Sequence, residues 1–106
     1  MGQGAPDRGR GVRGRKIPKV REATIEKKVT DFAKSKGWVS FKWVSPSQKG
    51  VPDRIYFRQG EIMLVEFKAP GKHPTKLQNH IHKKLKDAGF KVHVIDDIDR
   101  GKELLC

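Results

Sequence analysis

Cysteine is nearly absent from this chain of 106 residues. The one cysteine, Cys106, has no partner for an intramolecular disulfide, which also excludes a zinc site built from several thiolates. Long apolar runs are missing too, since none approaches the roughly 18 residues of a membrane span and the N-terminus lacks the apolar core of a secretory signal. The sequence therefore predicts a cytoplasmic protein with no membrane partner.

Apolar residues are also scarce: they make up 35% of the chain, and most of them follow position 20. This length fits one domain with one modest core. We expect residues 22–106 to form that domain. We expect residues 1–21 to form a flexible basic arm, because they are rich in glycine and arginine and have little apolar surface to bury. Such an arm either lies on phosphates or is a passive leader.

Acidic residues are few relative to basic ones. Twelve aspartates and glutamates stand against 24 lysines and arginines, which gives a formal net charge of +12. A balance of this kind attracts polyanions over long distances, so it predicts nucleic acid as the partner. Enzymes and passive binders share it, however, so the charge indicates the partner class and not the chemistry.

The spacing of apolar residues predicts seven elements in the order α, β, β, β, α, β, α. A helix between the third and fourth strands permits a parallel crossover, so we expect an α/β fold with a mixed sheet flanked by helices. The predicted elements are a helix over 21–36, a strand over 38–44, a hairpin of strands over 53–58 and 62–68, a helix that Thr75 begins and Gly89 ends, a strand over 90–95 and a closing helix over 98–105.

The residues that could carry chemistry are concentrated at the open end of the predicted hairpin, where its first strand begins and its second strand ends. Glu66 and Lys68 share one face of their strand, and Asp53 opens the antiparallel neighbour, so its carboxylate is expected to meet Glu66. Two carboxylates are the minimum that Mg²⁺ usually takes from a protein in addition to substrate phosphate. Lys68 is then placed to orient water or to stabilise developing charge, which together predicts phosphodiester hydrolysis.

The spacing of these three residues is not specific by itself, because charged residues at strand ends are ordinary surface features. The segment before Glu66 strengthens the prediction. Residues 62–65 are an unbroken apolar run, which is typical of a strand buried on both faces. A buried strand that ends abruptly in two charges favours a cleft at the edge of the core.

The first predicted helix carries Glu22 and Glu26 near its start. At about 100° per residue, Glu22 lies within roughly 35° of the centre of the apolar arc, and Glu26 lies about twice as far away. Glu22 is therefore expected to point toward the sheet, either as a partner of the helix dipole or as an aid to metal binding. Glu26 is expected to face solvent, and a modest rotation of the helix would exchange the two roles. The apolar arc consists of Ile25, Val29, Phe32 and Ala33.

Over residues 22–105 the chain resembles the VRR-NUC domain of the PD-(D/E)XK nuclease superfamily, particularly its compact standalone phage and bacterial members. Each motif is weak alone, but their order and spacing match across nearly the whole domain. The motifs are Glu22-x-x-Ile25-Glu26, Gly37-Trp38, Gly50-Val51-Pro52-Asp53, Glu66-Phe67-Lys68, Gln78 and Lys91-Val92-His93-Val94-Ile95.

The resemblance implies a restriction-endonuclease-like αβββαβ core and Mg²⁺ or Mn²⁺ as the cofactor. It implies that Asp53 and Glu66 bind the metal with Glu22 assisting, that Lys68 is the catalytic lysine and that Gln78 lies near the site. It also implies a symmetric homodimer that cuts branched DNA such as Holliday junctions. The alternatives are a nuclease for ordinary duplex, single strands or DNA ends, and a catalytically silent nucleic-acid-binding module.

Two further sets of residues are candidates for contacts. Basic side chains around the hairpin and the second long helix are expected to bind DNA phosphates, although a solvated helix face has the same pattern. Aromatic side chains are expected either to pack in the core or to be buried between two subunits. The DNA-binding candidates are Lys49, Arg54, Lys72, Lys76, Lys83 and Lys84, and the aromatic candidates are Trp38, Phe41, Trp43 and Tyr56.

Overall fold

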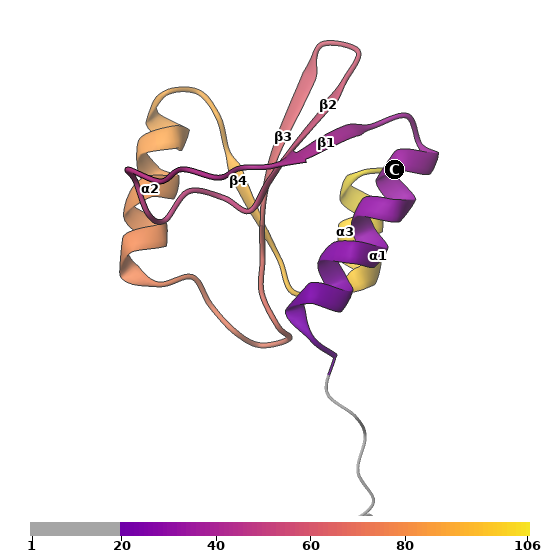
Figure 1. The fold of residues 1–106 in the computed structure, drawn as a ribbon, viewed down its shortest axis with the longest axis horizontal. Coiled ribbons are helices and arrows are strands. Elements are labelled where there is room, and N and C mark those ends of the chain that lie inside the picture. Colours follow the sequence, from indigo (N-terminus) through magenta and orange to yellow (C-terminus); the bar gives the residue numbers. More distant parts are fainter. Residues whose placement is uncertain (1–19) are drawn as a thin grey trace, which may run out of the picture.

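The computed structural model describes residues 20–106, so the predicted arm lies almost entirely outside the described residues. None of the described helices is long and apolar enough to cross a membrane. The order of elements is the predicted one (Figure 1). The elements are α1 (Glu22–Ser35), β1 (Val39–Lys42), β2 (Arg54–Arg58), β3 (Glu61–Phe67), α2 (Lys76–Asp87), β4 (Val92–Ile95) and α3 (Ile98–Leu104).

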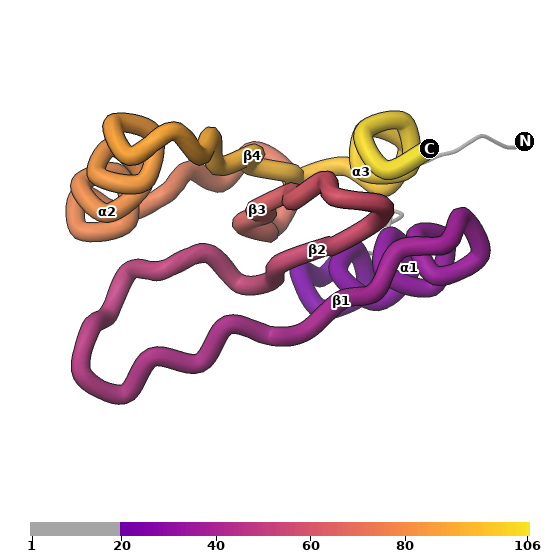
Figure 2. The backbone as a smooth tube through the Cα atoms, turned by 90° about the horizontal axis from the view of Figure 1, so that it is seen from above, coloured from indigo at the N-terminus to yellow at the C-terminus, as the bar shows by residue number. Residues whose placement is uncertain are grey.

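The four strands form one mixed sheet in the order β1-β2-β3-β4. The first three strands are antiparallel neighbours, and β4 runs parallel to β3 after the crossover through α2. Figure 2 shows α1 and α3 on one side of the strands and α2 on the other. The predicted α/β architecture with a mixed sheet and flanking helices is therefore confirmed.

The main difference from the prediction concerns β1, which is shorter than residues 38–44. Trp38 precedes the strand and is 3% exposed, and its indole N–H donates to the Leu105 carbonyl at 2.9 Å. At the other end, the Trp43 amide donates to the Asp53 carbonyl at 2.9 Å, which closes the base of the connection between β1 and β2. The strand thus ends where the chain begins to form this loop.

The core lies between the sheet and the helix pair α1 and α3. Tyr56 and Phe67 are fully buried on this face of the sheet. The Tyr56 hydroxyl hydrogen-bonds the Thr30 hydroxyl at 2.8 Å, so both polar groups are satisfied inside the core. Trp38 and Tyr56 are therefore internal residues, and the expectation that they might be buried between subunits is wrong. Other members of the core are Ile25, Val29, Ala33, Val65, Ile95 and Leu105.

A glycine sets the distance between α1 and α3. Gly101 is buried in α3, and a Cβ atom placed on it would lie 2.5 Å from a methyl group of Val29. Valine in a helix has little rotamer freedom, so Val29 cannot readily turn away. The close contact of the two helices therefore depends on the missing side chain at position 101.

Gly101→Val should lower the free energy of unfolding by about 2 to 3 kcal/mol, because the added side chain must displace Val29 or push α3 away from α1. Chemical denaturation followed by circular dichroism measures the change. Glu103→Ala, on the exposed face of the same helix, is the matched control and should alter the value by less than about 0.5 kcal/mol. Equal stability of the two variants would contradict the close helix contact.

Candidate active site

Asp53 and Glu66 face each other across the β2–β3 hairpin. Arg54 pairs with Val65 in the antiparallel register, so the next pair toward the open end is Asp53 with Glu66. The Asp53 carboxylate accepts a hydrogen bond from the Phe67 amide at 2.7 Å. Burial raises the pKa of Asp53, and this hydrogen bond opposes the rise. The predicted meeting of the two carboxylates is thus realised in the structure.

The segment Gly50-Val51-Pro52 explains how Asp53 is delivered to the start of β2. Gly50 has a φ of 91°, which favours glycine, and a Cβ there would lie 3.1 Å from side-chain atoms of both Leu77 and Ile81. Pro52 is fully buried. The loop therefore packs closely against α2, and the next residue enters the sheet in a fixed orientation.

Glu66 is the most unusual side chain of the site, because it is a carboxylate that is only 1% exposed. One carboxylate oxygen, Oε2, accepts a hydrogen bond from the side-chain amide nitrogen of Gln78 at 2.9 Å and lies 3.5 Å from the Lys68 ammonium. The other oxygen, Oε1, is buried with no hydrogen-bond partner among the described residues. Burial, and then the nearby charge of Asp53, raise the pKa of Glu66 to about 7.

Gln78 belongs both to this site and to the start of α2. Its side-chain carbonyl accepts a hydrogen bond from the backbone N–H of Thr75 at 2.9 Å. In return, the Thr75 hydroxyl accepts one from the backbone N–H of Gln78 at 3.1 Å. This reciprocal capping box fixes the Gln78 side chain and leaves its amide nitrogen to donate to Glu66. The position near the site, which only the family resemblance implied, is therefore observed.

Glu22 and Glu26 are arranged differently from the prediction. Glu22 is an exposed residue, and burial of part of its side chain and then the charge of Asp53 raise its pKa. Glu26 was expected to face solvent, but its side chain is only 13% exposed, and its carboxylate accepts a hydrogen bond from Arg54 at 2.7 Å. The prediction for Glu26 is therefore wrong, and Glu26 is the more buried of the two glutamates.

Thr30 accounts for this difference. It is 6% exposed because of its hydrogen bond to Tyr56, although a threonine is not expected in an apolar arc. Phe32 is only partly buried, and with Thr30 in its place the centre of the buried arc moves by roughly 40° toward Glu26, at about 100° per residue. Glu22 then lies close to the centre of the arc, and Glu26 lies about 35° from the centre, inside the arc.

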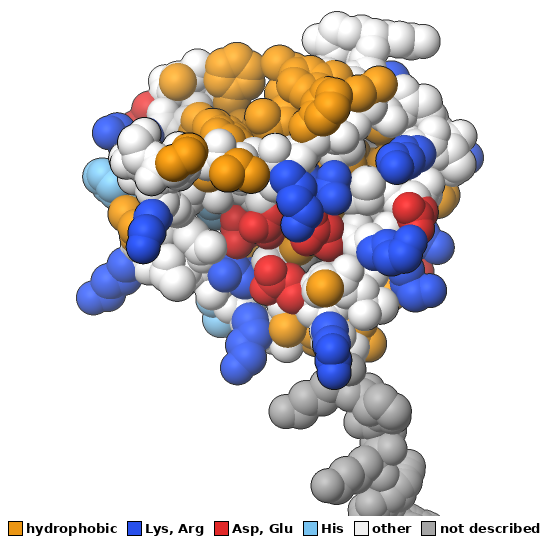
Figure 3. All heavy atoms as spheres, in the orientation of Figure 1, with side chains coloured by type: hydrophobic (Ala, Val, Ile, Leu, Met, Phe, Trp, Pro, Cys, Tyr) orange, Lys and Arg blue, Asp and Glu red, His pale blue; other side chains and the backbone are white. Residues whose placement is uncertain are grey.

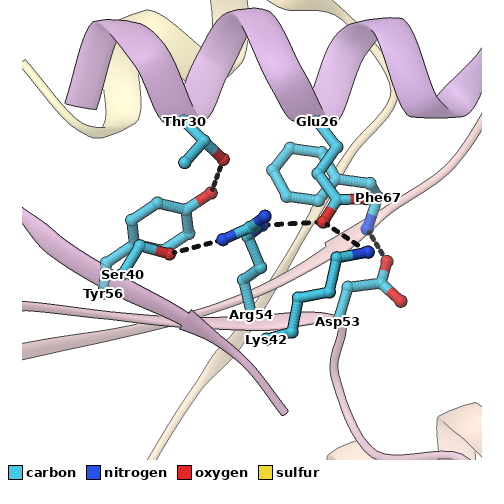
Figure 4. Close-up of polar contacts among 8 residues, drawn as sticks. All are labelled: Glu26, Thr30, Ser40, Lys42, Asp53, Arg54, Tyr56 and Phe67. Carbon is cyan, nitrogen blue, oxygen red and sulfur yellow. Dashed lines mark hydrogen bonds and ion pairs between the residues drawn. The ribbon is translucent and has the colours of Figure 1, made fainter. Parts of the chain in front are cut away.

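Glu26, Arg54 and Lys42 form an ion-pair cluster beside Asp53 (Figure 4). Arg54 donates to Glu26 through Nε and to the Ser40 hydroxyl, at 3.3 Å, through a terminal nitrogen. The Lys42 ammonium lies 3.5 Å from the same Glu26 oxygen. Sequence reasoning missed this cluster. Strand alternation predicts which face of β1 carries Lys42, but it does not predict the register between β1 and β2 that places Lys42 beside Arg54.

Comparison with known proteins agrees with this geometry, although no family model matches the sequence. The chain is 41% identical over 81 residues to the "Putative nuclease p44" of Acyrthosiphon pisum secondary endosymbiont phage 1, covering 76% of this chain and 87% of that protein. A solved structure described as a "VRR_NUC domain" superposes with a TM-score of 0.73 at 22% identity, covering 79% of this chain and 92% of the other. The chain belongs to the family of this putative phage nuclease, and it has the fold of a VRR-NUC domain.

The surface of this VRR-NUC protein around the site carries charges of both signs. Figure 3 shows acidic side chains gathered at the middle of one face, with basic side chains around them. Arg54, predicted to bind DNA, is only 19% exposed and is engaged by Glu26, so it faces α1. The other predicted DNA-binding residues are all exposed, and they are Lys49, Lys72, Lys76, Lys83 and Lys84.

The donor set of the VRR-NUC site fits a hard divalent cation. Among residues 20–106, no group of three aspartate, glutamate, histidine or cysteine side chains is close enough to hold a metal ion by itself. The opposed pair of Asp53 and Glu66 instead matches Mg²⁺ or Mn²⁺ sites that substrate phosphate and water complete. The buried Oε1 atom of Glu66 has no hydrogen-bond partner within residues 20–106, and a cation would supply one. Assistance from Glu22 stays a prediction.

The raised pKa of Glu66 predicts a pH dependence of stability without added metal. Glu66 has an ordinary value of 4.5 when unfolded and about 7 when folded, so its contribution to stability is present below pH 4.5 and is lost as the pH rises through 7. Between these values the unfolding free energy of the wild type should fall, relative to Glu66→Gln, by up to about 1.4 kcal/mol per pH unit. Denaturation in EDTA measures both proteins, and parallel curves would contradict the buried carboxylate.

Proposed function

We propose that this protein is a metal-dependent DNA endonuclease that hydrolyses phosphodiester bonds. The observation that carries the proposal is the buried carboxylate of Glu66, which stands opposite Asp53 and beside Lys68. One of its oxygens has no hydrogen-bond partner in the part of the chain that the structure describes. Such an oxygen costs free energy in the absence of a cation, so purely structural reasons for keeping it are weak. Membership of the family of the putative phage nuclease and the VRR-NUC fold support the same chemistry.

Each residue of the site has a defined part in this reaction. Asp53 and Glu66 would hold Mg²⁺ or Mn²⁺, which supplies an activated water and neutralises charge on the scissile phosphate. Gln78 fixes the orientation of Glu66 through its hydrogen bond to Oε2. Lys68, only 14% exposed, keeps its ammonium 3.5 Å from Glu66, where it can orient the attacking water or stabilise the negative charge that develops in the transition state.

A catalytically silent binding module is the competing function. The charge of the chain fits that function equally well, because long-range attraction to phosphate requires no active site. Retention of Asp53, Glu66 and Lys68 in contact geometry favours the enzyme, since a passive binder has no use for a buried carboxylate. We therefore place hydrolysis ahead of binding alone.

Removing one group of the site should abolish most of the cleavage. We expect Asp53→Asn, Glu66→Gln and Lys68→Met each to lower the turnover number by at least about 100-fold while DNA binding persists, because these groups act mainly in the transition state. Labelled duplex, single-stranded and four-way-junction DNA, each with Mg²⁺, Mn²⁺ or EDTA, provide the assay. Glu103→Gln on α3 is the control, and absence of cleavage of every substrate with both metals would refute the enzyme.

We further propose that the nuclease is a symmetric homodimer that prefers branched DNA such as Holliday junctions. Resolving a four-way junction requires paired cuts, and one site per chain supplies them most simply through two chains related by a twofold axis. The sheet offers a surface for this contact. Four apolar side chains of the uncovered face, here called the apolar face, are 38 to 62% exposed: Val39, Phe41, Phe57 and Ile62.

The apolar face lies on the part of the sheet that no helix covers. Val39 pairs with Phe57, and Phe57 pairs with Ile62, so the three side chains form one row across β1, β2 and β3. This row is near the β2–β3 turn, whereas Asp53 and Glu66 lie at the opposite end of the hairpin. A contact through the apolar face would bury these side chains and leave the two sites open to DNA.

Light scattering of the wild type should give twice the chain mass of 12.0 kDa, and Phe57→Glu should give the monomer mass, because a charge in the centre of the row opposes burial. Phe90→Glu is the matched control, since Phe90 is 46% exposed just after α2 and outside the row. A wild type that stays at 12.0 kDa with and without DNA would refute the dimer and favour single-strand nicking.

A further inference from the structure

Three basic side chains border the carboxylates of the site, and they differ in how much of each is exposed. Lys68 is 14% exposed and Arg54 is 19% exposed, and each is directed at a carboxylate of the protein. Lys42, at the end of β1, is 64% exposed. Of these three cations, the Lys42 ammonium is therefore the one that a polyanion can reach directly from solvent.

We propose that Lys42 is a phosphate-binding residue of the site, which holds a phosphodiester group of the DNA on the Asp53 side, and that Glu26 positions it. This proposal rests on the proposed nuclease function and adds the residue that receives the charge of the substrate. The ligand is a backbone phosphate, so Lys42 is expected to act on DNA of any sequence.

The need for such a residue follows from the electrostatics of the site. Burial and then the charge of Asp53 raise the pKa of both Glu22 and Glu66, so three carboxylates are close to one another here. The same charges repel an approaching phosphate, and the repulsion is strong where water is partly excluded. Lys68 partly offsets these charges from within the site, at both Glu66 and Asp53, but it is only 14% exposed, so a phosphate on the Asp53 side needs a cation nearer to solvent.

Lys42 is held in the position that compensates this side. It pairs with Arg54 in the β1–β2 register, so both side chains start from the same face of the sheet. Figure 4 shows the Lys42 side chain reaching toward Glu26 with Asp53 next to it. Burial raises the pKa of Asp53, and the charge of Lys42 is among the contacts that oppose this rise. The ammonium is thus directed at the site although most of the side chain is in water.

Glu26 is suited to a positioning role because it is itself fixed. Arg54 donates to its carboxylate at 2.7 Å, and the Ser40 hydroxyl holds the far side of the guanidinium. The same carboxylate oxygen lies 3.5 Å from the Lys42 ammonium. A free lysine loses considerable rotamer freedom when it binds a phosphate, and this contact restricts the side chain beforehand.

Phosphate binding by Lys42 can be measured without catalysis. Anisotropy of a labelled DNA duplex in EDTA, over a series of salt concentrations, should show that Lys42→Ala reduces the slope of log K against log salt by close to one unit, as expected for one lost phosphate contact. Lys27→Ala is the matched control. It removes the same charge from α1 nearby, but its ammonium is held 2.9 Å from Asp31 and not at Glu26 beside the site, so its slope should equal that of the wild type.

Single-turnover cleavage with Mn²⁺ then separates binding from chemistry. Lys42→Ala should raise the half-saturating DNA concentration by about 5- to 10-fold and lower the maximal rate by less than about 3-fold, and Lys42→Arg should restore the wild-type value because it keeps the charge. Identical slopes and half-saturating concentrations for Lys42→Ala and Lys27→Ala would overturn the proposal. If the wild type cuts no DNA, the proposed function fails, whereas the anisotropy comparison still decides the role of Lys42.

The positioning role of Glu26 has its own test. Glu26→Gln keeps an acceptor for Arg54 but loses its attraction for Lys42, so it should raise the half-saturating concentration as Lys42→Ala does. In the Lys42→Ala background the same change should add less than about 2-fold, because the two residues act through one contact. A Glu26→Gln variant that changes only the maximal rate, or whose effect is fully additive, would show that Glu26 does not act through Lys42.

Discussion

The burial of the Glu66 carboxylate constrains the arrangement of everything around it. A charged group with 1% exposure is costly unless neighbouring groups compensate it, and here Lys68 and Gln78 do so. From just after the same strand, Lys68 places its ammonium 3.5 Å away, and Gln78 donates a hydrogen bond from α2, whereas the nearby charge of Asp53 opposes ionisation and raises the pKa of Glu66. The cap that orients Gln78 can therefore be understood from the demands of this side chain, and the loop that delivers Asp53 adds a second carboxylate beside it.

The sheet divides its two ends between different tasks. Toward the β2–β3 turn it carries apolar side chains such as Phe57 on the face without helices, and toward the open end of the hairpin it carries the carboxylates. On the opposite face, α1 and α3 cover the core and are brought together at Gly101. In this small domain, one end of the sheet thus carries apolar side chains and the other end carries the charged side chains of the site.

The sequence was sufficient for the order of elements, because apolar spacing and the glycines at positions 37 and 89 determine where helices and strands begin and end. It was also sufficient for the meeting of Asp53 with Glu66, since a hairpin joined by a short turn has a restricted register. The orientation of Glu26 was not predictable in the same way. It depends on the rotation of α1, which the hydrogen bond between Thr30 and Tyr56 determines, and these residues are 26 positions apart.

The Gln78 side chain joins the stability of a helix end to the chemistry of the acid. Its carbonyl closes the first turn of α2 while its amide holds Glu66, so neither contact can be lost without disturbing the other. By thermodynamic linkage, a ligand that binds Glu66 in the orientation that Gln78 maintains also stabilises the first turn of α2. Fraying of that turn, in return, lowers the affinity for the ligand. One residue thereby couples the local folding of the helix end to the occupancy of the site.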